Sequence, residues 1–165
     1  MRNKNRQLHE IAITAIILKD GKFLIVRRAA TKKRFPSMWT VPGGKFEVED
    51  YINFPKDTES YWYNVLERTL RREVKEEVNL EIKNIEYLTS LAAIHPDGNP
   101  SLVISCTADY SSGNIKIEEG ELDDYAWVIL KEAKNYNLID GIFDELALAE
   151  KKRKGIKEEW QRSTK

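Results

Sequence analysis

The chain has 165 residues, 41% hydrophobic and 33% charged, which suits one domain with a proper core. Its 27 basic and 27 acidic residues balance, which excludes a strong overall charge that would attract nucleic acid or a membrane surface. A single cysteine, Cys106, excludes an internal disulfide and is typical of a reducing compartment. The longest aliphatic run, residues 11–18, is too short to span a bilayer and follows no signal-peptide pattern, so we expect a cytoplasmic protein.

The first third of the chain predicts two strands and a glycine turn. Residues 11–18 and 23–26 have strand composition, and Asp20-Gly21 between them is a strong hairpin signal. Residues 29–38 form a basic loop. In the segment 42–45 that follows, Pro-Gly-Gly-Lys, two glycines permit a tight bend and a close approach of backbone to a ligand. Alone, this segment is better explained as a plain surface turn.

The middle of the chain predicts a helix over residues 61–78. Its apolar side chains recur every four residues at Leu66, Leu70, Val74 and Val78. Asn79 favours the left-handed turn that ends a helix. The start is less sharply defined, because three residues are suitable N-caps: Asp57, Thr58 and Ser60.

Three glutamates of this helix share one face. Glu73, Glu76 and Glu77 stand at i, i+3 and i+4. Like charges at this spacing repel, and they are tolerated in solvent or around a divalent cation. From the helix alone, a solvated face with pairs such as Arg72–Glu76 is the favoured explanation, and a Mg²⁺ or Mn²⁺ site is the alternative.

The second half predicts three strands and a last helix. The strands cover residues 81–93, 102–108 and 124–130, with turns at 95–100 and 111–114, and the helix covers 139–152. Cys106 lies in an apolar strand, which indicates a buried structural thiol. The basic end, from about residue 151, is interpreted as an exposed helix end, with a partner-binding tail as the alternative. These elements indicate a mixed α/β class.

Together, residues 39–77 resemble the Nudix hydrolase family, whose signature is G-x5-E-x7-R-E-U-x-E-E-x-G-U, with U a bulky apolar residue. The matching residues are Gly44, Arg72, Glu73, Val74, Glu76, Glu77 and Leu80. Asp50 stands in the position of the first Glu, and Asn79 in that of the last Gly. Twenty-one residues separate Asp50 from Arg72 where the signature has seven, so 14 are inserted, roughly residues 51–64. We interpret them as an enlarged loop with an added helical turn, which leaves the place of Asp50 open.

The resemblance extends loosely over residues 11–148 and implies a Nudix-type α/β/α sandwich with a mixed central sheet. We expect a single domain over residues 1–165, with a core of about 8–150. The implied activity is divalent-metal-dependent hydrolysis of a pyrophosphate bond in a nucleoside diphosphate-X or nucleoside triphosphate, by water attack on phosphorus. The implied cofactor is Mg²⁺ (or Mn²⁺) and the implied partner is a nucleotide-type small molecule. We expect neither a membrane nor a nucleic-acid partner; a homodimer is left open.

The resemblance also assigns roles by matched position. Glu73 and Glu77 are expected to be direct metal ligands, and Glu76 is either a ligand or the base that takes the proton of the attacking water. The Gly43 carbonyl completes the coordination, and Arg72 holds a glutamate by a charge-assisted hydrogen bond. The candidates for substrate contact are Lys45, Arg27, Arg28 and Trp39, where only one of the two adjacent arginines would point inward on a strand. Candidates for a further acidic ligand are Glu47, Glu118, Glu119 and Glu121; Trp39, Phe35 and Trp62 are candidates for base stacking or for core packing.

Two other functions compete with hydrolysis. One is a catalytically reduced Nudix-fold nucleotide-binding or regulatory domain, which the acid at Asp50, the insertion and Asn79 would support. The other is an interaction domain with a merely charged helix, which leaves the Pro-Gly-Gly-Lys segment unexplained.

Overall fold

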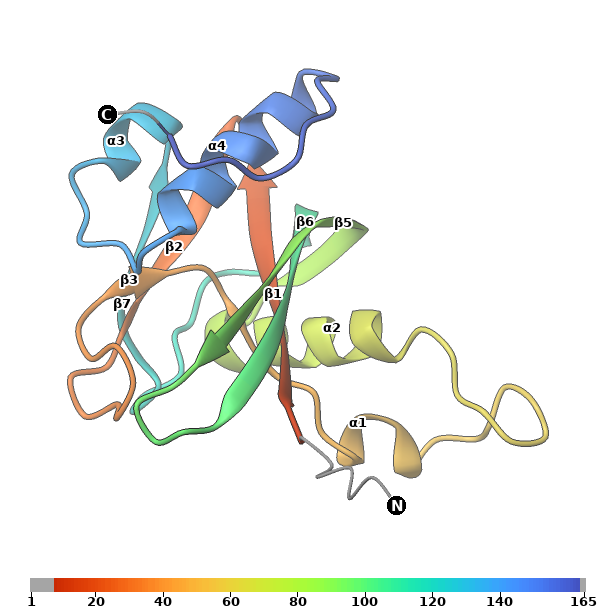
Figure 1. Cartoon of the computed structure of the whole chain (residues 1–165). Helices are drawn as coiled ribbons and strands as arrows, with labels where there is room; N and C mark the ends of the chain where they lie inside the picture. Colours follow the sequence, from red (N-terminus) through yellow and green to blue (C-terminus); the bar gives the residue numbers. More distant parts are fainter. Residues whose placement is uncertain (1–7, 164–165) are drawn as a thin grey trace, which may run out of the picture.

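The computed structural model describes residues 8–163, which contain seven strands and four helices (Figure 1). The strands are β1 (Glu10–Lys19), β2 (Lys22–Arg28), β3 (Trp39–Thr40), β4 (Gly43–Lys45), β5 (Glu81–Ile94), β6 (Pro100–Ser112) and β7 (Leu122–Val128). The helices are α1 (Glu49–Ile52), α2 (Val65–Val78), α3 (Leu130–Ala133) and α4 (Ile142–Arg153).

The strands form one mixed sheet centred on β1. Its order is β3-β2-β1-β6-β5, with β4 paired to β1 and β7 paired to β2. β1 runs parallel to β6 and antiparallel to β2 and β4. The predicted hairpin at Asp20-Gly21 is confirmed: both residues have positive φ, which a two-residue turn of this kind requires.

Helices cover both faces of the sheet (Figure 1). α2 packs on one face through Leu70, Val74 and Val78, all fully buried. α4 packs on the other through Ile142, Leu146 and Ala149. The α/β/α sandwich that the resemblance implied is therefore confirmed. None of the helices within residues 8–163 is long and apolar enough to cross a membrane.

The predicted helix bounds are right at one end and wrong at the other. α2 ends at Val78 and is closed by Asn79, which has the expected left-handed conformation with φ 58°. It begins at Val65, not at residue 61, because Asn64 is also left-handed (φ 53°), and a left-handed residue cannot continue the helix. Of the three N-cap candidates, Asp57 and Thr58 instead accept hydrogen bonds from Tyr63 N and Tyr61 N in the preceding loop.

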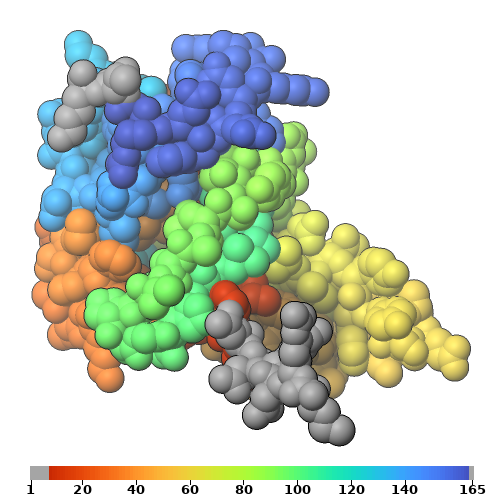
Figure 2. Space-filling view, in the orientation of Figure 1, coloured from red at the N-terminus to blue at the C-terminus, as the bar shows by residue number. Residues whose placement is uncertain are grey.

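The inserted residues 51–64 project from the body of the molecule, at the lower right of Figure 2. They begin in the single turn of α1 and continue as a loop with its own contacts. The Trp62 indole N–H donates to the Phe54 carbonyl at 2.8 Å. The Tyr51 ring lies between Phe46, at the end of β4, and Trp62, with centroid distances of 5.6 and 5.2 Å. The insertion is thereby packed against the strand that carries the glycine turn.

Candidate active site

The glycine turn and the glutamate helix meet directly. β4 pairs with β1 and lies against α2, so the backbone of Gly43 and Gly44 faces the helix. The Gly43 N–H donates to Glu77 Oε2 at 2.9 Å. A Cβ at Gly44 would overlap the carboxylate of Glu73. Two of the three glutamates are therefore packed against bare backbone, and a side chain at position 44 would displace one of them.

Glu77 has the most strongly perturbed carboxyl of this group. Burial raises the pKa of Glu77 to about 8; the hydrogen bond from Gly43 and the charge of Arg28 oppose this shift, while the charges of Glu73 and Glu121 add to it. Burial also raises the pKa of Glu73, against the opposing effect of Arg72. An ionised carboxylate in such surroundings is costly unless a positive charge approaches it.

Arg72 connects the helix carboxylates to the inserted segment. Its Nη1 lies 2.8 Å from Glu73 Oε1 and 2.9 Å from Glu76 Oε2. Its Nε donates to Asp50 Oδ1 at 2.5 Å, and its Nη2 to the Lys45 carbonyl at 3.2 Å. The place of Asp50, which the sequence left open, is therefore beside Arg72, with only 4% of the residue exposed. Burial alone would raise the pKa of Asp50, but hydrogen bonds from Arg72, Glu47 N and Thr69 lower it.

The four candidates for substrate contact separate into two groups. Arg28 is half-buried beside the charges of Glu77 and Glu121, and it donates to the Arg34 carbonyl. Lys45 immediately follows the glycines and is exposed. Arg27, in contrast, pairs with Asp123 at 2.6 Å and lies over the Trp39 ring. Trp39 is buried edge-on against Tyr136, in the cluster under α4, so the structure does not bring it to the glutamates.

The distant acidic candidates also differ in position. Glu121 lies close enough to Glu77 for its charge to raise the pKa of Glu77, and its carboxylate pairs with Lys32 at 2.5 Å. The Glu118 N–H donates to the Glu77 carbonyl, which ties this loop to the end of α2. Glu119 is exposed in the turn between them. Of the four, Glu121 is therefore the one whose carboxylate the structure brings near the helix glutamates.

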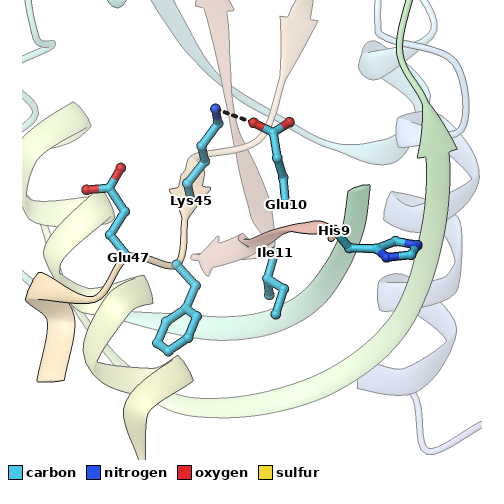
Figure 3. Close-up of a pocket in the computed structure, with 6 residues that line it drawn as sticks. His9, Glu10, Ile11, Lys45 and Glu47 are labelled. Carbon is cyan, nitrogen blue, oxygen red and sulfur yellow. Dashed lines mark ion pairs between the residues drawn. The ribbon is translucent and has the colours of Figure 1, made fainter. Parts of the chain in front are cut away.

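Glu47 lines a cavity of about 310 Å³ between the start of β1 and the end of β4. The other lining residues are His9, Glu10, Ile11, Lys45 and Phe46. Figure 3 shows Lys45 and Glu10 pointing toward each other, at an ion-pair distance of 2.5 Å, while Ile11 points the opposite way. Glu10 also accepts from Arg34 at 2.8 Å. The Glu10 carboxylate thus pairs with two cations, Lys45 and Arg34, next to the glycine turn.

Sequence reasoning matched Asp50 to the signature but left its role open, and it overlooked Glu10. For Asp50 a signal existed, since it stands six positions after Gly44, where the signature has its first glutamate. For Glu10 there was none, because its contacts with Lys45 and Arg34 depend on long-range pairing of the chain.

The donor atoms of these carboxylates suit a hard divalent cation. The carboxylates offer only oxygen donors beside backbone carbonyls, the donor set that Mg²⁺ and Mn²⁺ prefer. Within the part of the chain that the structure describes, no three His, Cys, Asp or Glu residues form a ready cluster for a metal. Glu77 is instead engaged by the Gly43 amide, and Glu73 and Glu76 by Arg72. The raised pKa values of Glu73 and Glu77 indicate the two carboxylates whose ionised form a bound cation would stabilise most.

We expect the metal-free protein to lose stability as the pH rises from 5.5 to 8.5. Unfolded Glu77 releases its proton near its ordinary pKa of 4.5, whereas the folded protein keeps it to about 8. Between these values the folded state binds more protons, so the free energy of unfolding decreases with pH, by about 3 kcal/mol over this range. Burial raises the pKa of Glu73 and Glu145 too, which adds to the effect. Thermal unfolding in a chelator checks this; a Tm that rises over the range would contradict it.

Comparison with known proteins agrees with this geometry. A family model described as a NUDIX domain matches residues 8–147. The chain belongs to the Nudix family. This Nudix protein is 28% identical over 142 residues to the nucleoside triphosphatase NudI of Klebsiella pneumoniae strain 342, covering 76% of the chain and 86% of the relative.

Two solved structures share the Nudix fold. The MutT NUDIX hydrolase from Burkholderia pseudomallei superposes with a TM-score of 0.66 at 20% identity, over 86% of this chain and 98% of that one. The NUDIX domain of Shewanella oneidensis NrtR, complexed with ADP-ribose, superposes with a TM-score of 0.62 at 24% identity, over 94% and 93%. The family match and the NudI likeness make this protein a Nudix pyrophosphohydrolase, an enzyme that hydrolyses a pyrophosphate bond in a nucleotide. Nudix hydrolases generally need a divalent metal.

Proposed function

We propose that this Nudix hydrolase holds Mg²⁺ or Mn²⁺ with Glu73, Glu76, Glu77 and the Gly43 carbonyl, and cleaves a nucleoside triphosphate or a nucleoside diphosphate-X. The supporting observation is the contact of the Glu73 and Glu77 carboxylates with the backbone of Gly43 and Gly44. This contact joins the two halves of the signature despite the 14 inserted residues.

The bound ion would supply charge neutralisation on the phosphate oxygens and a lowered pKa of the attacking water. The protein's own groups position the reactants. Arg72 orients Glu73 and Glu76 through Nη1. Glu76 is the most exposed of the three carboxylates and serves either as a further ligand or as the base. Glu121, near Glu77, is a candidate for a further ligand, and Glu47 is a weaker candidate because it faces the cavity beyond β4.

The phosphates of the substrate would be met by cations that now pair with carboxylates. Lys45 pairs with Glu10, and Lys32 pairs with Glu121. Arg28, the last residue of β2, is half-buried near the charge of Glu77. An anionic substrate can replace a carboxylate partner without leaving these cations unpaired. Arg27 and Trp39 are less favourable candidates, since one pairs with Asp123 and the other is buried.

The substrate class is supported by the relatives. NudI is named a nucleoside triphosphatase, and the NrtR domain was solved with ADP-ribose, a nucleoside diphosphate-X. We propose a single domain with its core at about residues 8–150, acting in the cytoplasm on a small nucleotide, as a monomer or a homodimer. The lone, buried Cys106 supports a reducing compartment.

The test is turnover of a nucleotide panel by the purified chain with Mg²⁺ or Mn²⁺. The panel should include nucleoside triphosphates, ADP-ribose, NAD and nucleoside diphosphate sugars, with products separated by chromatography. Water labelled with ¹⁸O identifies the attacked phosphorus by the product that gains the label. Binding without products over the whole panel would favour a catalytically reduced nucleotide-binding domain instead.

A further inference from the structure

A buried hydroxyl lies behind the Arg72 contact. Thr69, on the turn of α2 before Arg72, is fully buried, and its Oγ1 lies 2.8 Å from Asp50 Oδ2. The Val65 carbonyl is a second acceptor at 3.0 Å, as is common for a threonine inside a helix. The hydroxyl has one proton to donate, and the anionic carboxylate is the stronger acceptor, so we assign its hydrogen bond to Asp50 Oδ2.

Asp50 is held from several sides at once. Besides Thr69, the Glu47 N–H donates to Asp50 Oδ2 at 2.9 Å. Arg72 contributes Nε to Oδ1 at 2.5 Å and Nη2 to Oδ2 at 3.2 Å. The backbone amide and the hydroxyl both reach the oxygen that Arg72 holds less closely, which leaves Oδ1 for the short Arg72 contact.

The pair also closes the base of the insertion. Asp50 directly precedes the inserted residues 51–64, and Thr69 lies just beyond them in α2, so their contact brings the two ends of the insertion together. Without that contact the side chain of Asp50, one methylene shorter than the glutamate of the signature, would have to reach Arg72 from the start of a projecting loop.

We propose that Thr69 is a positioning residue that forms a matched pair with Asp50, and that this pair takes the place of the longer acid in fixing Arg72. Arg72 in turn sets the carboxylates of Glu73 and Glu76. The proposal rests on the metal-binding function above. It requires that Asp50 keep a hydroxyl partner at position 69, and that Asp50→Glu be tolerated only when Thr69 is made smaller at the same time.

A double-mutant cycle on the full chain tests this, with Mn²⁺ affinity by calorimetry and Tm as readouts. Thr69→Val keeps the shape and removes the hydroxyl, and Thr69→Ala is the single variant that the cycle requires. Each should weaken Mn²⁺ binding about tenfold or more, since groups that orient metal ligands typically contribute 10–100-fold. Asp50→Glu should cause a similar loss, because a further methylene meets the fully buried Thr69. Thr69→Ser keeps the hydroxyl and should bind Mn²⁺ within about threefold of the wild type.

The decisive variant is Asp50→Glu combined with Thr69→Ala. It restores the acid of the signature and removes the hydroxyl and one methyl group that occupy its space, so it should recover Mn²⁺ affinity to within about threefold of the wild type. Where turnover is measured, Thr69→Val should lower kcat more than it raises KM. Thr69 acts through Asp50 and Arg72 on the carboxylates that we assign to the metal.

Additive losses in the double variant, wild-type affinity in Thr69→Val, or loss of affinity in Thr69→Ser would each overturn the proposal. If Thr69→Val does not fold, the serine and the exchanged-pair variants still decide. A wild-type protein that binds Mn²⁺ but cleaves nothing in the panel refutes the proposed hydrolysis alone, since the cycle does not need turnover. A wild-type protein that binds no Mn²⁺ refutes both.

Discussion

Replacing Glu77 by glutamine should lower kcat/KM by about 100-fold or more, a loss of roughly 2.7 kcal/mol or more in transition-state stabilisation, while the fold survives. Glutamine keeps the size of the side chain and an oxygen that can accept from Gly43 N–H, at 2.9 Å in the wild type. It removes the anionic oxygen that we assign to the metal. Steady-state kinetics at saturating Mg²⁺ with the best substrate of the panel measures the loss.

The same substitution should act oppositely on the metal-free fold. The raised pKa of Glu77, caused by burial, means that its ionisation destabilises the folded state at alkaline pH. Without an ionisable group at this position, the chelator-treated variant should be at least as stable as the wild type at pH 8.5. A matched control is Glu67→Gln, which changes an exposed carboxylate on the first turn of α2. Normal turnover by Glu77→Gln, or equal losses in both variants, would contradict the assigned role.

The parts of the fold that local chemistry determines were the ones that could be predicted. The hairpin at Asp20-Gly21 and the end of α2 at Asn79 depend on backbone conformations that those residue types favour. The long strands and both main helices follow from hydrophobic periodicity. In contrast, β3, β4, α1 and α3 have only two to four residues each, too few for a period to be recognised.

The start of α2 shows where local reasoning failed. The residues Tyr61, Trp62 and Tyr63 have no helix breaker among them, yet they belong to the inserted loop. Contacts such as Trp62 Nε1 with the Phe54 carbonyl hold that loop, and Asn64 then adopts a left-handed conformation. Tertiary contacts of this kind override helix propensity, and no window of sequence contains them.

The candidate site could likewise be predicted only in part. The spacing of Glu73, Glu76 and Glu77 put them on one helix face, and the resemblance joined that face to the glycine turn. The helical spacing also predicted the Arg72–Glu76 pair, which the structure confirms at 2.9 Å. Neither the spacing nor the resemblance could show that Glu77 turns toward Gly43, because that contact depends on how β4 crosses the helix. The placement of Trp39 under α4 was equally hidden, since a tryptophan beside a glycine turn suits a core and a pocket alike.

Replacing Gly44 by alanine should weaken Mn²⁺ binding and kcat/KM by about 10- to 100-fold, with little change in Tm. Unlike Gly43, Gly44 is not among the residues with positive φ, so its backbone admits an alanine. The new methyl group would instead overlap the Glu73 carboxylate and push it away from the turn. A control is Gly21→Ala, where φ is 76° and the new methyl group meets no atom: it should lower Tm through backbone strain and leave Mn²⁺ binding unchanged.

A second cycle identifies the group through which Gly44 acts. If the methyl group harms binding by displacing the Glu73 carboxylate, then Gly44→Ala should cost little more in a Glu73→Gln background, where that carboxylate is already absent as an anion. If the alanine instead distorts β4, its cost should persist in full in that background, since the pairing of Gly44 with Ile13 does not involve Glu73. Persistence would therefore mean that position 44 requires glycine for the strand itself, and that the carboxylate contact is only a consequence of how closely β4 approaches α2.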